Sequence, residues 1–159
     1  MTISVRPGVA DDLPLIAQLI RELAEYERLS NAVRFDEAEL GEHLFGPSPK
    51  AEVLIGEADA QPQGFALFFP TFSTFEGKSG IWLEDLYVRP AARGEGLGKA
   101  LLLKVAQFAT ERGCARFEWS VLNWNAPSIG FYRSLGAVPL NDWQMMRMDR
   151  TALESLNNR

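Results

Sequence analysis

The chain has 159 residues, a length that suits one folded domain, and 47% of its residues are apolar and 23% charged, as in soluble globular proteins. Its formal net charge of −5 argues against a nucleic-acid partner and for a cationic small substrate, although only weakly. With one cysteine, Cys114, and one histidine, His43, an intrachain disulfide is excluded, and neither a metal centre nor a histidine-based catalytic triad is expected.

The first half of the chain predicts one strand, two helices and two further strands. Residues 1–14 lack the basic start and apolar run of a signal peptide, and no segment reaches the length of a membrane span, so we expect a cytoplasmic protein without a membrane partner. A short strand at Ile3–Pro7 precedes an amphipathic helix within residues 10–29, and a shorter helix spans Asp36–Phe45. The first helix has its predicted buried face at Leu13, Ile16, Ile20 and Leu23. Residues 51–58 and 63–73 predict adjacent strands.

The second half alternates strands and helices, which favours a mixed α/β sheet. A strand at residues 79–90 leads through a glycine-rich loop into a helix that ends near Gly113, with Leu101, Leu102, Val105 and Phe108 facing inward. A strand at residues 114–122, a helix at 126–136 and a last strand at 143–149 follow. The predicted order is β-α-α-β-β-β-α-β-α-β in a single domain, residues 1–159.

The glycine-rich loop is the strongest candidate for ligand binding. Gly94, Gly96 and Gly98 lie between the strand and the helix, where glycine permits positive φ angles that align backbone N–H groups toward an anion. The helix adds its unpaired first N–H groups, and Arg93 and Lys99 add positive charge on either side. The loop therefore predicts a phosphate or pyrophosphate site, with a ligand-free turn as the alternative.

Two familiar nucleotide motifs do not fit this loop. A mononucleotide P-loop requires serine or threonine after the lysine and an earlier glycine, whereas Ala100 follows Lys99 and Arg93 stands at the glycine position. A dinucleotide fingerprint requires its last two glycines to be three residues apart, whereas Gly96 and Gly98 are two apart. Arg93-x-x-Gly96-x-Gly98 instead resembles the acyl-coenzyme-A loop of the GNAT N-acetyltransferases.

An amine acetyltransferase needs groups that move protons, because an alkylammonium with a pKa of about 10.4 has no lone pair for attack. Glu84 and Asp85 interrupt an apolar strand just before the loop, and strand alternation predicts that they point to opposite faces. A solvated carboxylate pair is the alternative for these two residues. Tyr132, in the helix at 126–136, is a candidate acid for the departing thiolate, with plain core packing as the alternative.

The resemblance covers nearly the whole chain. "YERLS", "FSTFEGKSGIWLEDLYVRPAARGEGLG", "VLNWNAPSIGFYRSLGA" and "DWQMMRMD" together are similar to the diamine acetyltransferases, the GNAT branch that acetylates spermidine, spermine and related amines. The resemblance implies the GNAT fold, with a mixed, mostly antiparallel sheet flanked by helices, acetyl-CoA as co-substrate and a homodimer.

The resemblance also implies roles for particular residues. Glu84 would help to bind and deprotonate the amine, and Tyr132 would protonate the thiolate. The coenzyme-binding residues would be Leu86, Tyr87, Val88, Arg93, Gly94, Glu95, Gly96, Leu97, Gly98, Lys99, Asn125, Ala126, Pro127 and Ser128. The amine-binding residues would be Tyr26, Glu27, Glu84, Glu118, Trp119 and Ser120.

The acceptor amine remains open at the level of the sequence. Glu22, Glu25 and Glu27 form an acidic helix end that could attract a distant ammonium, with a solvated charged face as the alternative. The segment before Trp143 is shorter than is usual in the family and offers only Asp142, so both a polyamine and a lysine-like amine such as thialysine are expected candidates.

The sequence thus predicts direct acetyl transfer from acetyl-CoA to a small primary amine. No acyl-enzyme is expected, because Cys114 reads as a small buried residue rather than a nucleophile. The rival functions are acetylation of a protein N-terminus or lysine side chain, and a coenzyme-A-binding module without catalysis.

Overall fold

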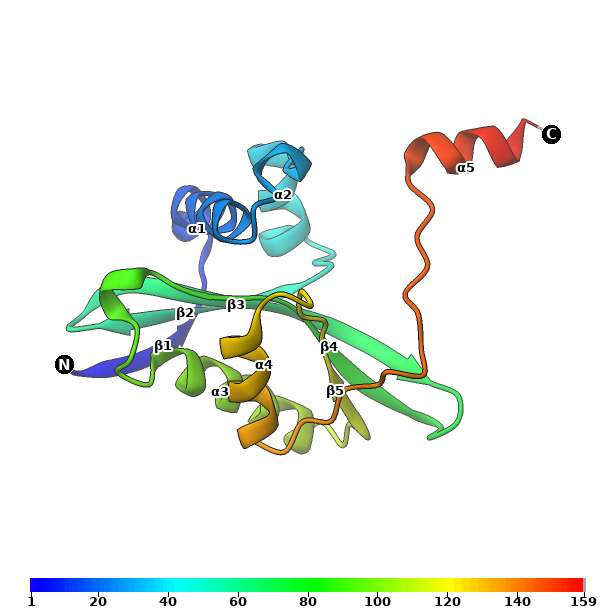
Figure 1. Ribbon diagram of the computed structural model, residues 1–159. Helices are drawn as coiled ribbons and strands as arrows, with labels where there is room; N and C mark the ends of the chain where they lie inside the picture. Colours follow the sequence, from blue (N-terminus) through cyan, green and yellow to red (C-terminus); the bar gives the residue numbers. More distant parts are fainter. Residues whose placement is uncertain (159) are drawn as a thin grey trace. The chain divides into compact units, whose positions relative to one another are not determined.

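The computed structural model describes residues 1–158 and contains a single five-stranded sheet (Figure 1). The strands follow the order β1-β2-β3-β4-β5, and all neighbours are antiparallel except β4 and β5, which are parallel. Their bounds are Ile3–Pro7 for β1, Glu52–Ala58 for β2, Gln61–Ser73 for β3, Lys78–Val88 for β4 and Arg116–Glu118 for β5. The prediction of a mixed, mostly antiparallel sheet is confirmed.

The chain divides into two compact units, Met1–Ser120 and the residues from Val121 onward. All five strands belong to the first unit, together with the helices α1 (Leu13–Tyr26), α2 (Glu37–Phe45) and α3 (Leu97–Glu111). The prediction of a single domain over residues 1–159 stays a prediction.

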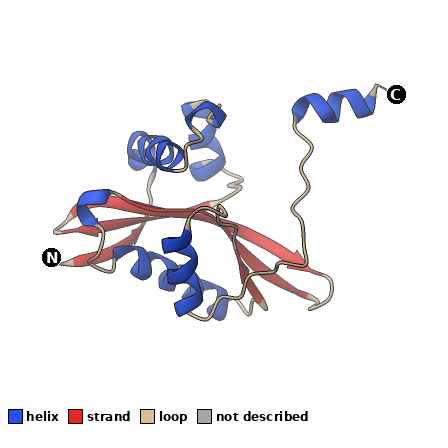
Figure 2. Ribbon diagram, in the orientation of Figure 1, coloured by secondary structure: helices blue, strands red, loops and turns tan. Residues whose placement is uncertain are grey.

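Helices cover both faces of the sheet in the first unit (Figures 1 and 2). On one face lie α1 and α2, and on the other lies α3. Pro14 stands in the first turn of α1, where its missing N–H costs no hydrogen bond, and Asp36 caps α2 by accepting a 2.9 Å hydrogen bond from the Glu39 N–H. These local signals explain why both helices begin where the sequence predicts.

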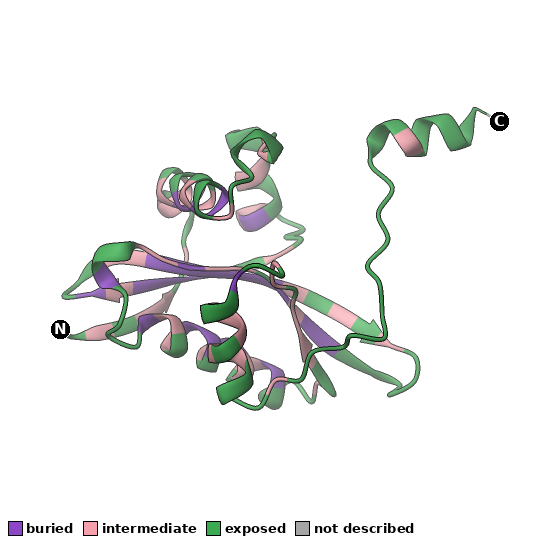
Figure 3. Ribbon diagram, in the orientation of Figure 1, coloured by how far each residue is buried: buried purple, intermediate pink, exposed green. Residues whose placement is uncertain are grey.

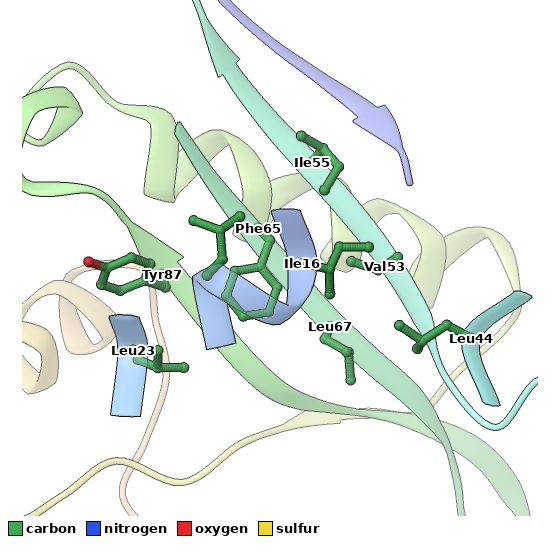
Figure 4. Packing of buried hydrophobic residues seen from close by; sticks show 9 residues of the cluster. Ile16, Leu23, Leu44, Val53, Ile55, Phe65, Leu67 and Tyr87 are labelled. Atoms are coloured by element: carbon green, nitrogen blue, oxygen red, sulfur yellow. The ribbon is translucent and has the colours of Figure 1, made fainter. Parts of the chain in front are cut away.

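The core on the α1 face joins the inner side of α1 to alternate residues of three strands (Figure 4). Ile16 and Leu19 are fully buried, and they share a cluster with Ile55 of β2, Phe65 of β3 and Tyr87 of β4. Figure 3 shows that burial concentrates on the central strands and on the sides of the helices that face them. Full burial of each aliphatic side chain contributes about 1.5–3 kcal/mol, so this cluster anchors α1 to β4.

The opposite face of the sheet packs closely against α3. Leu101 and Val105 are fully buried, and the rings of Phe68 and Phe108 lie 5.9 Å apart. A Cβ atom on Gly56 of β2 would come within 2.9 Å of Leu97 Cδ1, so glycine lets the start of α3 approach the sheet. This packing fixes the N-terminal end of α3 beside the strands.

The second unit contains two helices, α4 (Ala126–Ser134) and α5 (Arg150–Asn157). Asn125 is buried and caps α4 by accepting a 3.4 Å hydrogen bond from the Ser128 N–H. The sequence did not predict α5, which begins after Asp149, an N-cap that accepts a 2.9 Å hydrogen bond from the Ala152 N–H.

The last two predicted strands differ from the structure: the first is shorter than predicted, and the second is absent from the described residues. The strand expected at residues 114–122 is only three residues long, and residues 143–149 are not in a strand. Alternation of apolar residues is not sufficient for a strand, because its backbone groups need a neighbouring strand. The side chains of Trp143 and Met146 are 75% and 85% exposed.

Candidate active site

An irregularity in β4 positions the two carboxylates of the "LED" segment. Leu67 of β3 pairs with Asp85, but the next residue, Phe68, pairs with Leu83, so Glu84 has no partner on β3. This pattern is a β-bulge, in which one extra residue interrupts the regular alternation of side chains.

The bulge places Glu84 and Asp85 on the same face of the sheet. Asp85 lies opposite Leu67, whose side chain belongs to the core on the α1 face. Trp82 lies opposite Phe69, two residues from Leu67 and therefore on this face as well, and its Nε1–H donates a 2.9 Å hydrogen bond to Glu84 Oε2. The prediction that strand alternation separates the two carboxylates was wrong, because the extra residue shifts the alternation.

Glu27, at the C-terminal end of α1, completes a cluster of three carboxylates that we call the acidic cluster, Glu27, Glu84 and Asp85. Burial raises the pKa of Asp85 to about 7, with a further contribution from the negative charges of Glu84 and Glu27. The pKa of Glu27 is also raised, chiefly by burial and then by Glu84. A cation bound here would relieve the mutual repulsion, and Asp85 can exchange a proton near neutral pH.

Glu22 does not belong to this acidic cluster. Its two carboxylate oxygens accept hydrogen bonds of 3.1 and 3.0 Å from Nε and Nη2 of Arg89, in a bidentate ion pair that ties α1 to the residue after β4. The sequence indicated an acidic end of this helix. In the structure the charge of Glu22 is paired with that of Arg89, and Glu25 is exposed. Only Glu27 interacts with the carboxylates of β4.

The glycine-rich loop has the backbone geometry expected of an anion site. Gly94 and Gly96 adopt φ angles of 83° and 88°, and Gly96 immediately precedes α3. A Cβ atom on Gly94 would meet no other atom within 4 Å, so the loop is open around this position. The first N–H groups of α3 have no partner within the helix by the geometry of any helix start. Loop and helix together can bind an anion.

The edge of β4 beside this loop has no strand of the described chain paired to it. Within residues 1–158, β5 pairs only with Gly80–Trp82, and the pairing of β4 with β5 ends there. Leu86, Tyr87 and Val88 lie beyond that point, and their backbone pairs with β3 on the other side. This is the segment that the resemblance assigns to the pantetheine arm of the coenzyme.

Arg93, at the start of the loop, is bound to groups outside the loop. Its Nε–H donates a 2.8 Å hydrogen bond to the carbonyl oxygen of Val88. The central carbon of its guanidinium lies 4.9 Å from the ring centre of Tyr26 and 5.6 Å from that of Tyr87. The structure therefore brings Arg93 together with Tyr26, which the sequence assigned to the amine side.

The remaining acceptor-side candidates of the first unit lie at the end of β5. Glu118 pairs with Trp82 in the parallel register and lies on the face that holds the acidic cluster. The rings of Trp119 and Phe117 lie 4.9 Å apart, and Ser120 follows as the last residue of the unit.

The candidates of the second unit all lie on or next to α4. Asn125 is the N-cap, and Ala126, Pro127 and Ser128 form the first turn. Tyr132 is half-buried, and its ring lies 5.4 Å from that of Phe131.

Sequence reasoning missed Asp85 and Trp82 as site residues. Asp85 was visible as half of a carboxylate pair in an apolar strand, but nothing in the sequence indicated the bulge. Among residues 1–158, no group of three acidic, histidine or cysteine side chains could hold a metal ion. No helix in the described part of the chain is long and apolar enough to cross a membrane.

The structure contains a glycine-rich turn at the start of α3 and the acidic cluster at the end of α1 and in β4. Residues 16–137 match the family described as "Acetyltransferase (GNAT) family", and the chain belongs to this family. The prediction of an N-acetyltransferase is confirmed.

Two relatives match nearly the whole chain. A thialysine N-epsilon-acetyltransferase of Sus scrofa is 36% identical over 166 residues, which cover 98% of this chain and 97% of that protein. A spermidine/spermine N(1)-acetyltransferase-like protein 1 of Homo sapiens is 34% identical over 159 residues, which cover 94% of this chain and 23% of that protein. Both belong to the branch that the sequence resembles.

A solved structure supports the fold. The integron cassette protein VCH_CASS6 from the mobile metagenome of V. cholerae superposes with a TM-score of 0.81 at 24% identity, covering 100% of this chain and 99% of that one. The prediction of the GNAT fold is confirmed.

Proposed function

We propose that the protein transfers acetyl from acetyl-CoA to the primary amine of a lysine-like amino acid or a small polyamine. The observation that carries this proposal is the acidic cluster, which gathers Glu27, Glu84 and Asp85 on one face at the end of α1. Such a cluster attracts an ammonium group and can also accept its proton. The GNAT family uses acetyl-CoA, which supplies the activated acetyl group when bound.

The residues of the glycine-rich loop fit the pyrophosphate of coenzyme A. Gly94 and Gly96 have positive φ angles, and the start of α3 offers N–H donors beside them. Glu95, Leu97, Gly98 and Lys99 complete this segment. The free edge at Leu86–Val88 suits an extended amide chain, and the family resemblance assigns Asn125–Ser128 to further coenzyme contacts.

The acidic cluster has to remove one proton from the amine. Deprotonating an alkylammonium at pH 7 costs about 4–5 kcal/mol, at about 1.36 kcal/mol per pKa unit. A base with a pKa near the working pH is the most effective acceptor, which favours Asp85 with its pKa of about 7. We assign the ammonium contact to Glu84 and Glu27, and the proton to Asp85 or to Glu84 through water.

We assign the protonation of the departing thiolate to Tyr132. The family resemblance is the support for this role, and a phenol of ordinary pKa can protonate a thiolate without strong perturbation. Attack of the neutral amine on the thioester carbonyl and departure of the thiol complete the reaction, so no acyl-enzyme is required. Glu118, Trp119 and Ser120 are proposed to shape the acceptor channel.

The acceptor class is tested by thiol release from acetyl-CoA with a matched set of amines. Thialysine, lysine, spermidine and spermine are compared with a lysine-containing peptide at equal concentration. We expect a kcat/KM at least about tenfold higher for one of the small amines than for the peptide. A preference for the peptide would support the rival function, acetylation of a protein.

We further propose that the protein is cytoplasmic and that it forms a homodimer, as the resemblance implies. Exposed large apolar side chains between residues 138 and 148 support self-association, because a monomer rarely exposes so many in one short segment. These side chains are Val138, Leu140, Trp143, Met145, Met146 and Met148. Light scattering after size exclusion should give a molar mass of about twice that of the chain. The double variant Trp143→Ser/Met146→Ser should shift the measured mass toward that of the monomer. A monomeric wild-type protein would contradict this proposal.

A further inference from the structure

Arg93 lies in the loop segment assigned to the coenzyme, but its side chain contacts the two elements that carry the acidic cluster. One of its aromatic partners, Tyr26, is the last residue of α1 and immediately precedes Glu27. The other, Tyr87, lies two residues after Asp85 in β4. A guanidinium over an aromatic face is attracted to the ring. Arg93 thus connects the loop to α1, next to Glu27, and to β4, which contains Glu84 and Asp85.

The two tyrosines differ in how firmly they are held. Tyr87 is 7% exposed and belongs to the hydrophobic core, and its hydroxyl donates a 3.5 Å hydrogen bond to Glu22. Tyr26 is 38% exposed and is the last residue of α1. Because Tyr87 is held in the core, Arg93 connects the core to Tyr26, the residue that precedes Glu27.

Two glycines of the loop have open space around their Cβ positions. A Cβ atom on Gly94 would find no neighbour within 4 Å, and one on Gly96 would meet only Ile3 Cδ1, at 4.0 Å. An anion bound to the loop amides would contact the backbone that directly follows Arg93. The Nε–H bond to the Val88 carbonyl then sets the direction of the guanidinium.

We propose that Arg93 is a positioning residue that couples the coenzyme loop to the amine side of the site through Tyr26, and is not a phosphate ligand. This inference rests on the proposed function. Binding of coenzyme to the loop fixes Arg93, and Arg93 then holds Tyr26 and Glu27 where they meet the amine. Amine affinity therefore rises when coenzyme is bound.

The test compares Arg93→Met, which keeps length but not charge, with Arg93→Lys, which keeps charge but has neither the planar group nor Nε–H. Acetyl-CoA affinity is measured by calorimetry, and kcat and KM for the preferred amine by thiol release. Lys104→Met is the matched control, because Lys104 is also a cation over an aromatic ring, 5.4 Å from that of Phe108, and lies away from the loop.

Both Arg93 variants should raise the amine KM by roughly 3- to 20-fold, the range that a cation–π contact supports, and change the acetyl-CoA Kd by less than about twofold. Lys104→Met should change neither constant. Tyr26→Leu should raise the amine KM similarly, and its combination with Arg93→Met should add little more, because each removes the same contact.

Several results would overturn the inference. A loss of acetyl-CoA affinity in Arg93→Met that Arg93→Lys restores would identify a phosphate ligand. An unchanged amine KM in an active Arg93→Met enzyme, or fully additive effects of Arg93→Met and Tyr26→Leu, would exclude the coupling. A wild-type protein that acetylates no amine would instead contradict the proposed function. Thermal unfolding of each variant verifies that the exposed Arg93 is not needed for folding.

Discussion

Leu67 of β3 lies directly opposite Asp85 of β4, while the next residue of β3, Phe68, lies opposite Leu83. The unpaired residue between them is Glu84, and the shift turns Asp85 toward the α1 face. One extra residue in a strand thereby creates a cluster of carboxylates with Glu27. The account of proton removal in this enzyme depends on that shift.

Asp85→Asn should reduce kcat/KM for the amine by at least about tenfold at pH 8, because the proton acceptor with the best-matched pKa is lost. In the wild-type enzyme, kcat/KM should rise as the pH increases through about 7, because Asp85 ionises there. The variant should not show this rise. A pH–rate series on both proteins measures it. Asp11→Asn is the control, because Asp11 is an exposed carboxylate just before α1. This variant should keep the rise of kcat/KM with pH. An unchanged profile in Asp85→Asn would remove Asp85 as the base.

The raised pKa of Asp85 also predicts a pH-dependent stability. The folded state holds this proton up to about pH 7, whereas the unfolded chain releases it near 3.8, so the unfolded state binds fewer protons between these values. The contribution of Asp85 to the free energy of unfolding therefore falls as pH rises from about 4 to 7, by up to about 4 kcal/mol at 1.36 kcal/mol per pKa unit.

Asp85→Asn removes this penalty, so the variant should be more stable than the wild type at pH 8 and not at pH 4. Urea unfolding of both proteins at the two pH values checks it, because the difference between them isolates Asp85 from other titrating groups. A variant that is less stable at pH 8 would show that the carboxylate is not strained.

Gly96→Ala should weaken acetyl-CoA binding. Gly96 has a φ angle of 88°, where a side chain costs about 1–2 kcal/mol, and its methyl group would also narrow the approach to the loop amides. Calorimetry should give a Kd at least about fivefold higher. Gly130→Ala is the matched control, since Gly130 is inside α4 with no atom near its Cβ position, and binding should stay unchanged. Equal effects of both substitutions would argue against a site at this loop.

Tyr132→Phe should lower kcat by about 10²–10³-fold and leave the acetyl-CoA Kd within about twofold, because only the proton donor is removed. Single-turnover kinetics with saturating coenzyme measure the chemical step. Phe131→Leu alters the neighbouring ring and should have a much smaller effect. Unchanged turnover in Tyr132→Phe would remove this residue from the mechanism.

Local signals made the central elements predictable from the sequence. The Asp36 cap, the proline in the first turn of α1 and the period of its apolar residues give both early helices, and the glycine spacing gives the turn before α3. These features depend on residues that are close in the sequence, so short-range rules describe them.

Features that depend on pairing with distant segments were not predictable. The bulge at Glu84 depends on how β3 meets β4, and the missing strand at residues 143–149 depends on a partner that no pattern within the segment specifies. Arg93 was predicted as a coenzyme contact from its place in the loop, but its contacts with Tyr26 and Tyr87 arise from the fold. The parts of the site that the sequence did not predict are therefore contacts between residues far apart in the chain.

Acetyl transfer by the wild type is compared with that by a variant that lacks the two carboxylates of β4. Thiol release from acetyl-CoA and the acetylated amine are measured together at pH 7.5, with thialysine and with spermidine. We expect the wild type to show saturable thiol release with one acetylated amine per thiol. The Glu84→Gln/Asp85→Asn double variant should lose at least about 100-fold of this rate and still bind acetyl-CoA. Wild-type turnover retained in that variant would contradict a catalytic role for Glu84 and Asp85.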